Sequence, residues 1–228
     1  MLLHDIGSLH ILAGAAVGFA IGVTGVGGGS LMTPLLLLFG YPPSVAIGTD
    51  LLYAALTKAG GVIAHHRQKS INWSVVTLLS LGSLPAALLT RVALNRGWLG
   101  AAKGEESLLT ISLGVMLILT ALMLVTRNRL REAARRGQPS AIMATIHRNK
   151  GAATFCMGLV LGVCVTLSSV GAGAFAAAIL MTLYADAPTS RIVGTDIAHA
   201  VPLTLIAGLG YMAVGSVDVT LLLGLLIG

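Results

Sequence analysis

The chain contains few charged residues and few aromatic ones. Of its 228 residues, 10% are Asp, Glu, Lys or Arg and 4% are Phe, Trp or Tyr, whereas 56% are hydrophobic. A soluble globular domain carries about 25% charged residues and roughly 45–50% apolar ones. The shortage of charge argues against a soluble domain, and the excess of apolar residues excludes an intrinsically disordered chain. The expected solvent for most of this chain is lipid.

The net positive charge is confined to one segment. The formal net charge is +6, and residues 127–150 contain seven Lys or Arg residues against one Glu, which accounts for the whole excess. A short basic segment of this kind is typical of a cytosolic loop in a membrane protein. The charge therefore does not indicate a surface that binds nucleic acid.

Cysteine is also scarce. Cys156 and Cys164 lie eight residues apart in one apolar run, a spacing that a disulfide within a single helix cannot bridge. Two thiols alone make a poor metal site, so both are predicted to be packing residues. The sequence predicts neither a metal site nor a cofactor.

Long uncharged stretches predict an all-α, polytopic membrane protein. A helix that spans the membrane needs about 20 mainly apolar residues. Asp, Glu, Lys and Arg are absent from residues 6–49, 70–90, 107–126, 151–185 and 197–217. The stretches 70–90 and 107–126 each suit one crossing.

The two longest uncharged stretches are interrupted by glycine clusters, and each is predicted to form a helical hairpin with a short second arm. The expected hairpins pair 9–24 with 30–40 and 151–168 with 174–185. Further helices are expected at 44–65, at 190–211 and from Val219 onward.

The basic loops predict the orientation in the membrane. Residues 127–150 should be cytosolic, and counting helices backward also places residues 65–69, which contain Arg and Lys, in the cytosol. Counting forward places residues 215–218, which contain no basic residue, outside. The N-terminus is then outside as well.

Comparison of the chain with itself predicts an internal repeat. A shift of 146 residues aligns Gly48-Thr49-Asp50 with Gly194-Thr195-Asp196. The same shift pairs Gly25 with Gly171, Gly27 with Gly173, Pro42 with Pro188, and Ser44 with Ser190. The predicted organisation is repeat one at 9–126, a basic cytosolic linker at 127–150, and repeat two at 151–228.

Each repeat unit would contain a hairpin and three crossings, an odd number of changes of side, so the two units should have opposite orientations. Inverted repeats are common in secondary transporters, with the substrate site between the halves near mid-membrane. Because Gly228 aligns with Gly82 and repeat one continues to about Thr126, repeat two is expected to be truncated at its C-terminus.

The glycine clusters between the hairpin arms are candidate anion sites, because glycine permits close backbone approach and a helix N-terminus favours negative charge. The first cluster comprises Gly25, Gly27, Gly28, Gly29 and Ser30. The second comprises Ser168, Ser169, Gly171 and Gly173. Close packing of helices through small residues is the alternative interpretation.

Asp50 and Asp196 are candidate proton-carrying residues. An acid within a membrane span is costly unless it faces a polar cavity, and loss of solvent favours the neutral form of a carboxyl group in general. Alternatively, these acids and the preceding threonines only hydrogen-bond to broken backbone. Lys58 could pair with Asp50, attract an anion or, as is slightly favoured, reach the cytosolic surface.

His199 lies one turn after Asp196 and could share its proton, although a packing role is equally consistent with the sequence. A serine hydrolase using Ser168 or Ser169 with His199 is disfavoured, because no Gly-x-Ser-x-Gly sequence is present. A purely structural membrane protein would not require twin intramembrane acids.

The sequence GVTGVGGGSLMTPLLLLFG at 22–40, followed by VAIGTD at 45–50, resembles the TauE/SafE (sulfite exporter) family of permeases. The elements INW at 71–73, GSLPA at 82–86 and the second GTD at 194–196 fit the same resemblance. It implies a transporter of the bacterial inner (cell) membrane that carries sulfite, a sulfonate or a related small anion. It also implies that Thr49 and Thr195 take part in coordinating the substrate.

The sequence therefore predicts a secondary transporter of a small anion, coupled to protons, and not an enzyme. The glycine clusters would bind the anion, and Asp50 and Asp196 would carry protons with His199 as a weaker helper. The alternative is a passive anion channel. The expected partners are the anion, protons and the lipid bilayer but not nucleic acid, and a homo-oligomer is left open.

Overall fold

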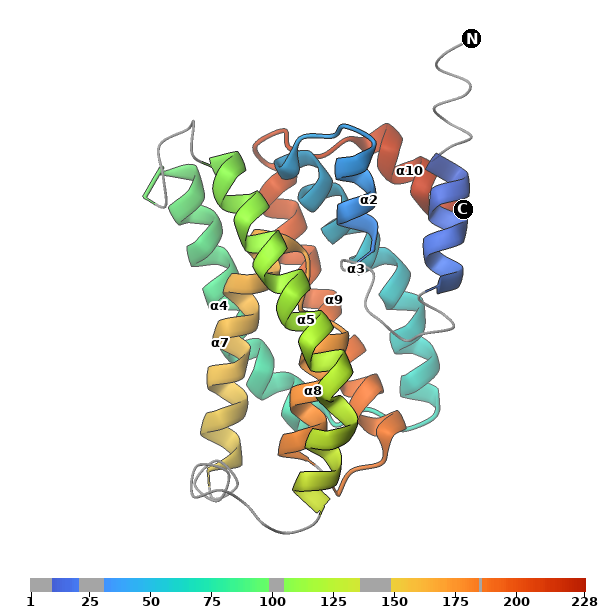
Figure 1. Ribbon diagram of the computed structural model, residues 1–228, viewed down its shortest axis with the longest axis vertical. Coiled ribbons are helices and arrows are strands. Elements are labelled where there is room, and N and C mark those ends of the chain that lie inside the picture. The colour runs from blue at the N-terminus through green and yellow to red at the C-terminus, as the bar shows by residue number, and fades with distance from the viewer. Residues whose placement is uncertain (1–9, 21–30, 99–104, 136–148, 185) are drawn as a thin grey trace.

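The computed structural model describes residues 10–20, 31–98, 105–135, 149–184 and 186–228, and these form an elongated bundle of helices without a strand (Figure 1). The all-α prediction is confirmed. The helices are His10–Ala20, α2 Met32–Leu38, α3 Pro43–Arg67, α4 Trp73–Asn95, α5 Glu105–Arg135, α7 Lys150–Ser168, α8 Ala174–Leu183, α9 Thr189–Met212 and α10 Val219–Ile227.

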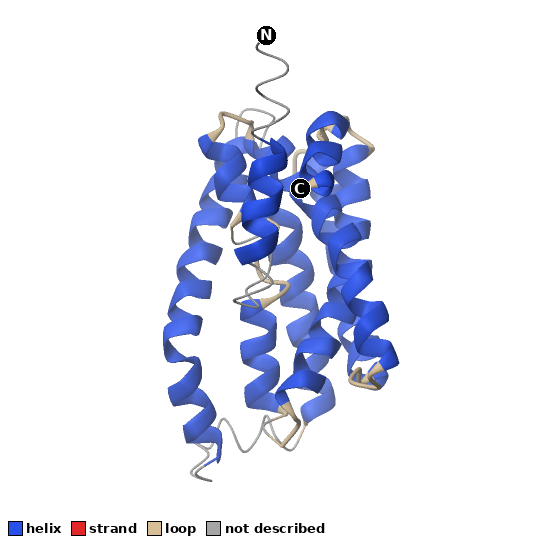
Figure 2. Ribbon diagram, turned by 90° about the vertical axis from the view of Figure 1, so that its right-hand side faces the viewer, coloured by secondary structure: helices blue, strands red, loops and turns tan. Residues whose placement is uncertain are grey.

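Four of the described helices are long and apolar enough to cross a membrane: α4, α5 over Glu105–Met123, α7 and α9. They run roughly along the long axis of the bundle (Figure 2). Residues spaced three or four apart share one face of a helix. On α5 such a stripe of exposed apolar side chains comprises Ile111, Val115, Ile118, Leu122 and Val125, as expected for a surface that contacts lipid.

Each hairpin has a short second arm. The seven residues of α2 and the ten of α8 give helices of about 10 and 15 Å at 1.5 Å per residue, well short of the roughly 30 Å hydrocarbon core. Neither arm is therefore long enough to cross the membrane, as predicted. The first glycine cluster lies outside the described residues.

Two helices are longer than the uncharged stretches that predicted them. The helix α4 continues to Asn95 instead of ending near residue 90, and α5 continues to Arg135, into the segment predicted to be a linker. The Arg, Leu, Glu and Ala residues that follow Thr126 are all strong helix formers. Charge ends the apolar stretch there but does not end the helix.

The helices α3 and α9 pack against each other, and the start of each lies at very close range to the turn that follows the other. An added Cβ on Gly48 would overlap the carbonyl oxygen of Ser216, and one on Gly194 would lie 2.7 Å from the carbonyl oxygen of Ser70. These two contacts are reciprocal, because Gly48 and Gly194 are 146 residues apart, and so are Ser70 and Ser216. Only glycine permits this separation at both positions.

Two helix caps are related by the same shift, because Asn72 and Asp218 are also 146 residues apart. At the start of α4, the side chain of Asn72 accepts a hydrogen bond from the Val75 N–H at 3.4 Å. At the start of α10, the Asp218 side chain accepts one from the Leu221 N–H at 2.9 Å. Each cap satisfies one of the backbone donors that a helix N-terminus leaves free.

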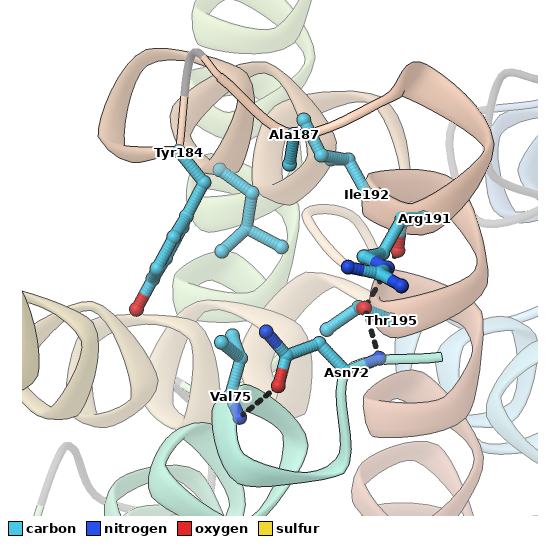
Figure 3. Close-up of a pocket in the computed structure, with 8 residues that line it drawn as sticks. Asn72, Val75, Tyr184, Ala187, Arg191, Ile192 and Thr195 are labelled. Atoms are coloured by element: carbon cyan, nitrogen blue, oxygen red, sulfur yellow. Dashed lines mark hydrogen bonds between the residues drawn. The ribbon is translucent and has the colours of Figure 1, made fainter. Parts of the chain in front are cut away.

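The backbone of each cap residue is bound by a threonine from the other half of the chain. The Asn72 N–H donates to Thr195 Oγ1 at 3.0 Å (Figure 3), and the Asp218 N–H donates to Thr49 Oγ1 at 3.2 Å. Both threonines are buried. Each Gly-Thr-Asp sequence therefore fixes the start of a helix in the opposite half.

The helices α4 and α7 also pack backbone to backbone. An added Cβ on Gly158 would overlap the Leu79 carbonyl oxygen, whereas one on Gly114 of α5 would meet nothing within 4 Å.

We expect Gly158→Ala to lower the free energy of unfolding by about 1–3 kcal/mol, the usual cost of overpacking. Gly114→Ala is the matched control, and thermal unfolding in detergent compares the two. Equal melting temperatures would contradict the close α4–α7 contact.

The threonine contacts predict a second effect on stability. Thr195→Val keeps the shape of the side chain but leaves the Asn72 N–H without its acceptor, which costs about 1–3 kcal/mol for a buried donor. Thr49→Val should destabilise to a similar extent through Asp218. Thr195→Ser and Thr49→Ser retain the hydroxyl and serve as controls in the same unfolding measurement. A valine variant as stable as its serine counterpart would refute the contact.

Candidate functional site

The break between α7 and α8 lies inside the bundle. Its residues 169–173 are buried, and Ser169, Gly171 and Gly173 all have positive φ angles, of 57°, 121° and 147°. Such angles are readily adopted by glycine and are uncommon for other residues. The Ser168 hydroxyl is used within the break, because it donates to the Cys164 carbonyl at 2.7 Å and accepts from the Val170 N–H at 3.2 Å.

Asp50 on α3 is completely buried beside this break. Its Oδ2 accepts a hydrogen bond from the Thr33 hydroxyl at 2.5 Å. The Ser169 hydroxyl interacts with the same carboxylate. Neither Ser169 Oγ nor Asp50 Oδ1 has a hydrogen-bond partner of standard geometry among the described residues.

Lys58 lies two turns after Asp50 on α3 and points into the bundle. Its Nζ donates to the Ala172 carbonyl in the α7–α8 break at 2.7 Å. Its ammonium group interacts electrostatically with the carboxylates of both Asp50 and Asp196. The interpretation that Lys58 reaches the cytosolic surface is therefore wrong. The carbonyl that holds it belongs to a residue 114 positions away in sequence.

Asp196 and His199 lie on α9, which packs against α3. Asp196 is 4% exposed and His199 is fully buried. The His199 Nε2 atom is 2.8 Å from the Ser83 hydroxyl of α4, so the hydrogen bond that orients this ring goes to Ser83 instead of Asp196. Asp196 Oδ1 and His199 Nδ1 have no hydrogen-bond partner among the described residues.

These residues form one group, which we call the central polar cluster: Asp50, Lys58, Ser169, Asp196 and His199. They come from α3, the α7–α8 break and α9. Four of their buried atoms lack a hydrogen-bond partner within the described part of the chain, namely Asp50 Oδ1, Ser169 Oγ, Asp196 Oδ1 and His199 Nδ1. Buried polar atoms are costly when unpaired, so the cluster is the best candidate for a place where a polar ligand binds.

Other candidate residues lie elsewhere or are already engaged. Thr49 and Thr195 bind the helix caps described above. Gly171 packs against Met116, because a Cβ added to Gly171 would lie 3.2 Å from the Met116 Cε atom. Gly173 is the N-cap residue of α8. Among the described residues, no group of three His, Cys, Asp or Glu could hold a metal ion.

Thr33 and Ser83 join the site as hydrogen-bond partners that the sequence did not identify. Thr33 lies three residues after Ser30 and Ser83 lies three residues after Ser80, and many serines and threonines in helices bond only to their own backbone. Their spatial partners, Asp50 and His199, lie 17 and 116 residues away. Both lie in sequences that resemble the family, Thr33 in the stretch 22–40 and Ser83 in GSLPA at 82–86, and this resemblance is the signal that could have pointed to them.

Related proteins are named as probable membrane transporters. The chain is 40% identical over 218 residues to the probable membrane transporter protein YjnA of Bacillus subtilis, covering 96% of this chain and 84% of that protein. It is 28% identical to the probable membrane transporter protein YdhB of the same organism, again over 96% of this chain and 84% of the relative. No solved structure matches the chain significantly.

The family match covers nearly the whole sequence. Residues 10–228 match the sulfite exporter TauE/SafE family, as the resemblance of the glycine-rich and Gly-Thr-Asp sequences predicted. The family comprises transporters and not enzymes, which agrees with a helical bundle that has several apolar helices able to span a membrane. This chain is therefore a multi-pass membrane transporter protein that belongs to the sulfite exporter TauE/SafE family.

Proposed function

We propose that the chain is a secondary transporter that moves a small anion, such as sulfite or a sulfonate, together with protons through the central polar cluster. Lys58 would attract the anion, and Asp50 and Asp196 would carry the protons. The observation that carries this proposal is the position of the Lys58 ammonium group, which donates to the Ala172 carbonyl in the α7–α8 break. Asp50 lies on the same helix, and Asp196 lies on α9, which packs against it.

Charge balance in the cluster provides the coupling. Charges interact strongly where water is excluded, and an uncompensated charge is costly there. With one acid ionised and the other protonated, the charge of Lys58 is already balanced and the cluster is neutral without an anion. With both acids protonated, Lys58 has no counter-ion, so a bound anion restores neutrality. Protons and anion are therefore expected to enter and leave this site together.

The α7–α8 break supplies further contacts suited to an anion. The Ser169 hydroxyl has no hydrogen-bond partner among the described residues, so it could donate to an anion. The ten-residue helix α8 begins at Ala174, immediately after the break, and its N-terminus favours negative charge. We propose the same anion-binding role for the glycine cluster at 25–30, which includes Ser30.

We propose in addition that repeat one at 9–126 and repeat two at 151–228 are inverted copies joined by the segment 127–150. The reciprocal glycine and threonine contacts support this, because each joins residues whose partners recur 146 positions away. The basic charge of 127–150 supports a cytosolic position for that segment and an outside N-terminus. The family match supports a bacterial inner membrane.

A gradient experiment in proteoliposomes tests the proposed coupling. With an imposed pH gradient, we expect radiolabelled sulfite to accumulate against its own gradient in vesicles containing the natural chain. Asp50→Asn cannot exchange a proton, so uphill accumulation should fall to the level of protein-free vesicles. Asp186→Asn makes the same change at an exposed position and should leave accumulation unchanged.

Strictly downhill sulfite flux that is the same in the natural chain and in Asp50→Asn would reject proton coupling and favour a passive anion channel. Purification of each variant as a monodisperse protein with the natural melting temperature separates loss of coupling from loss of folding. A destabilised Asp50→Asn would be replaced by Asp196→Asn, for which the same loss of uphill flux is expected.

A further inference from the structure

A polar cavity lies away from the central polar cluster, where α3 begins and α4 ends. Figure 1 shows these two helix ends at the same end of the bundle. Its volume is about 440 Å³, within the range of about 300–1,000 Å³ typical of small-molecule sites. The lining residues come from α3, α4, α5 and the segment that follows α9, and those used below are Ser44, Arg91, Glu105 and Glu106.

Arg91 is held rigidly at this cavity. It is only 6% exposed, its Nε donates to the Gly210 carbonyl at 3.0 Å, and its guanidinium carbon lies 4.0 Å from the centre of the Tyr211 ring. These two contacts fix the plane of the guanidinium group. Its Nη1 atom, however, has no hydrogen-bond partner among the described residues, although the side chain lines the cavity.

The two glutamates of the cavity are bound very differently. Glu106 is bound to Ser44, because its two carboxylate oxygens accept hydrogen bonds from the Ser44 hydroxyl at 2.6 Å and from the Ser44 N–H at 3.1 Å. This contact also places a negative charge at the N-terminus of α3, where it is favourable. Glu106 is therefore not a free counter-ion for Arg91.

Glu105 is the loosely held counter-ion. Its Oε1 atom is 3.6 Å from Arg91 Nη1, and its side chain is 31% exposed. A charge-assisted hydrogen bond between such groups is usually about 2.7–2.9 Å long. Partly exposed ion pairs of this length contribute little, so another anion could displace the Glu105 carboxylate without breaking the contacts that position Arg91.

We propose that this cavity is a docking site for a small oxyanion, with Arg91 as the binding group and Glu105 as a carboxylate that competes with the anion. The planar guanidinium group suits oxyanions because its N–H donors match the spacing of two oxygen atoms. The inference rests on the proposed function, since the anion is the one that continues to the central polar cluster. Arg91 lies about 6 Å from the end of α4, close to the membrane surface.

Two charge-removing variants should shift anion binding in opposite directions. Glu105→Gln removes the competing charge and should tighten sulfite binding about fivefold, which corresponds to the loss of one weak ion pair. Arg91→Gln removes the binding group and should weaken binding at least about tenfold. Isothermal titration of sulfite into the detergent-purified full chain measures both. Arg96→Gln, at an exposed arginine that stacks on Trp98, is the matched control and should leave the affinity unchanged.

Glu105→Gln decides the outcome even where Arg91→Gln fails to fold. If Glu105 and Arg91 were only a structural ion pair, Glu105→Gln would leave sulfite binding unchanged or weaken it, and the proposal would be overturned. Absence of sulfite binding in both the natural chain and Glu105→Gln would overturn it as well. Arg91→Lys keeps the positive charge but lacks the planar guanidinium group, so its sulfite affinity should lie between those of the natural chain and Arg91→Gln.

The same titration separates this proposal from the proposed function. Asp50→Asn alters the central polar cluster and leaves the Arg91 cavity intact. If transport assays reject proton coupling but Glu105→Gln still tightens and Arg91→Gln still weakens sulfite binding, the docking site stands alone. If coupling is supported and the two variants leave binding unchanged, the docking site is rejected alone.

Discussion

Charge compensation inside an apolar bundle is the constraint on which the rest of the structure depends. An ammonium group in lipid is costly unless it is paired, and so is a carboxylate. The chain brings Lys58 together with Asp50 and Asp196 and adds the Ala172 carbonyl as a hydrogen-bond acceptor. One positive group then faces two groups that can each be charged or neutral. Under the proposed mechanism, this imbalance links the arrival of an anion to the arrival of protons, because only certain combinations leave the cluster neutral.

The cluster exists because two helices approach each other closely enough to share it. Glycine at positions 48 and 194 lets α3 and α9 pass almost backbone to backbone against the turns that end the opposite helix. Threonine at the next position binds the cap of a helix from the other half. The third residue of each Gly-Thr-Asp sequence is then a buried acid. Three consecutive residues therefore provide close approach, helix capping and a titratable group, which explains why this short sequence recurs in both halves.

The sequence predicted the helices well because uncharged stretches reflect the lipid solvent directly. It predicted the buried acids and the α7–α8 break for a similar reason, since charge and glycine are conspicuous in an apolar chain.

The sequence analysis failed where a side chain's direction depends on distant partners. Lys58 turns inward toward a carbonyl 114 residues away, and Arg91 was treated as the end of an apolar stretch although Gly210 and Tyr211 hold it inside. The hydroxyls of Thr49 and Thr195 bind helix caps, a pairing that only the folded bundle reveals, and their contact with substrate stays a prediction. Whether the glycine cluster at 25–30 binds an anion stays a prediction.

The most direct test of the account is whether Lys58 couples the movement of anions to that of protons. Vesicles containing the purified chain and an internal pH dye would receive an inward sulfite gradient without a pH gradient, with protein-free vesicles as background. We predict that sulfite entry acidifies the lumen above background for the natural chain, that Lys58→Gln abolishes both sulfite entry and acidification, and that Lys69→Gln, at an exposed loop lysine, preserves both. Sulfite entry and acidification at the natural rate in Lys58→Gln would contradict the central role of this ammonium group.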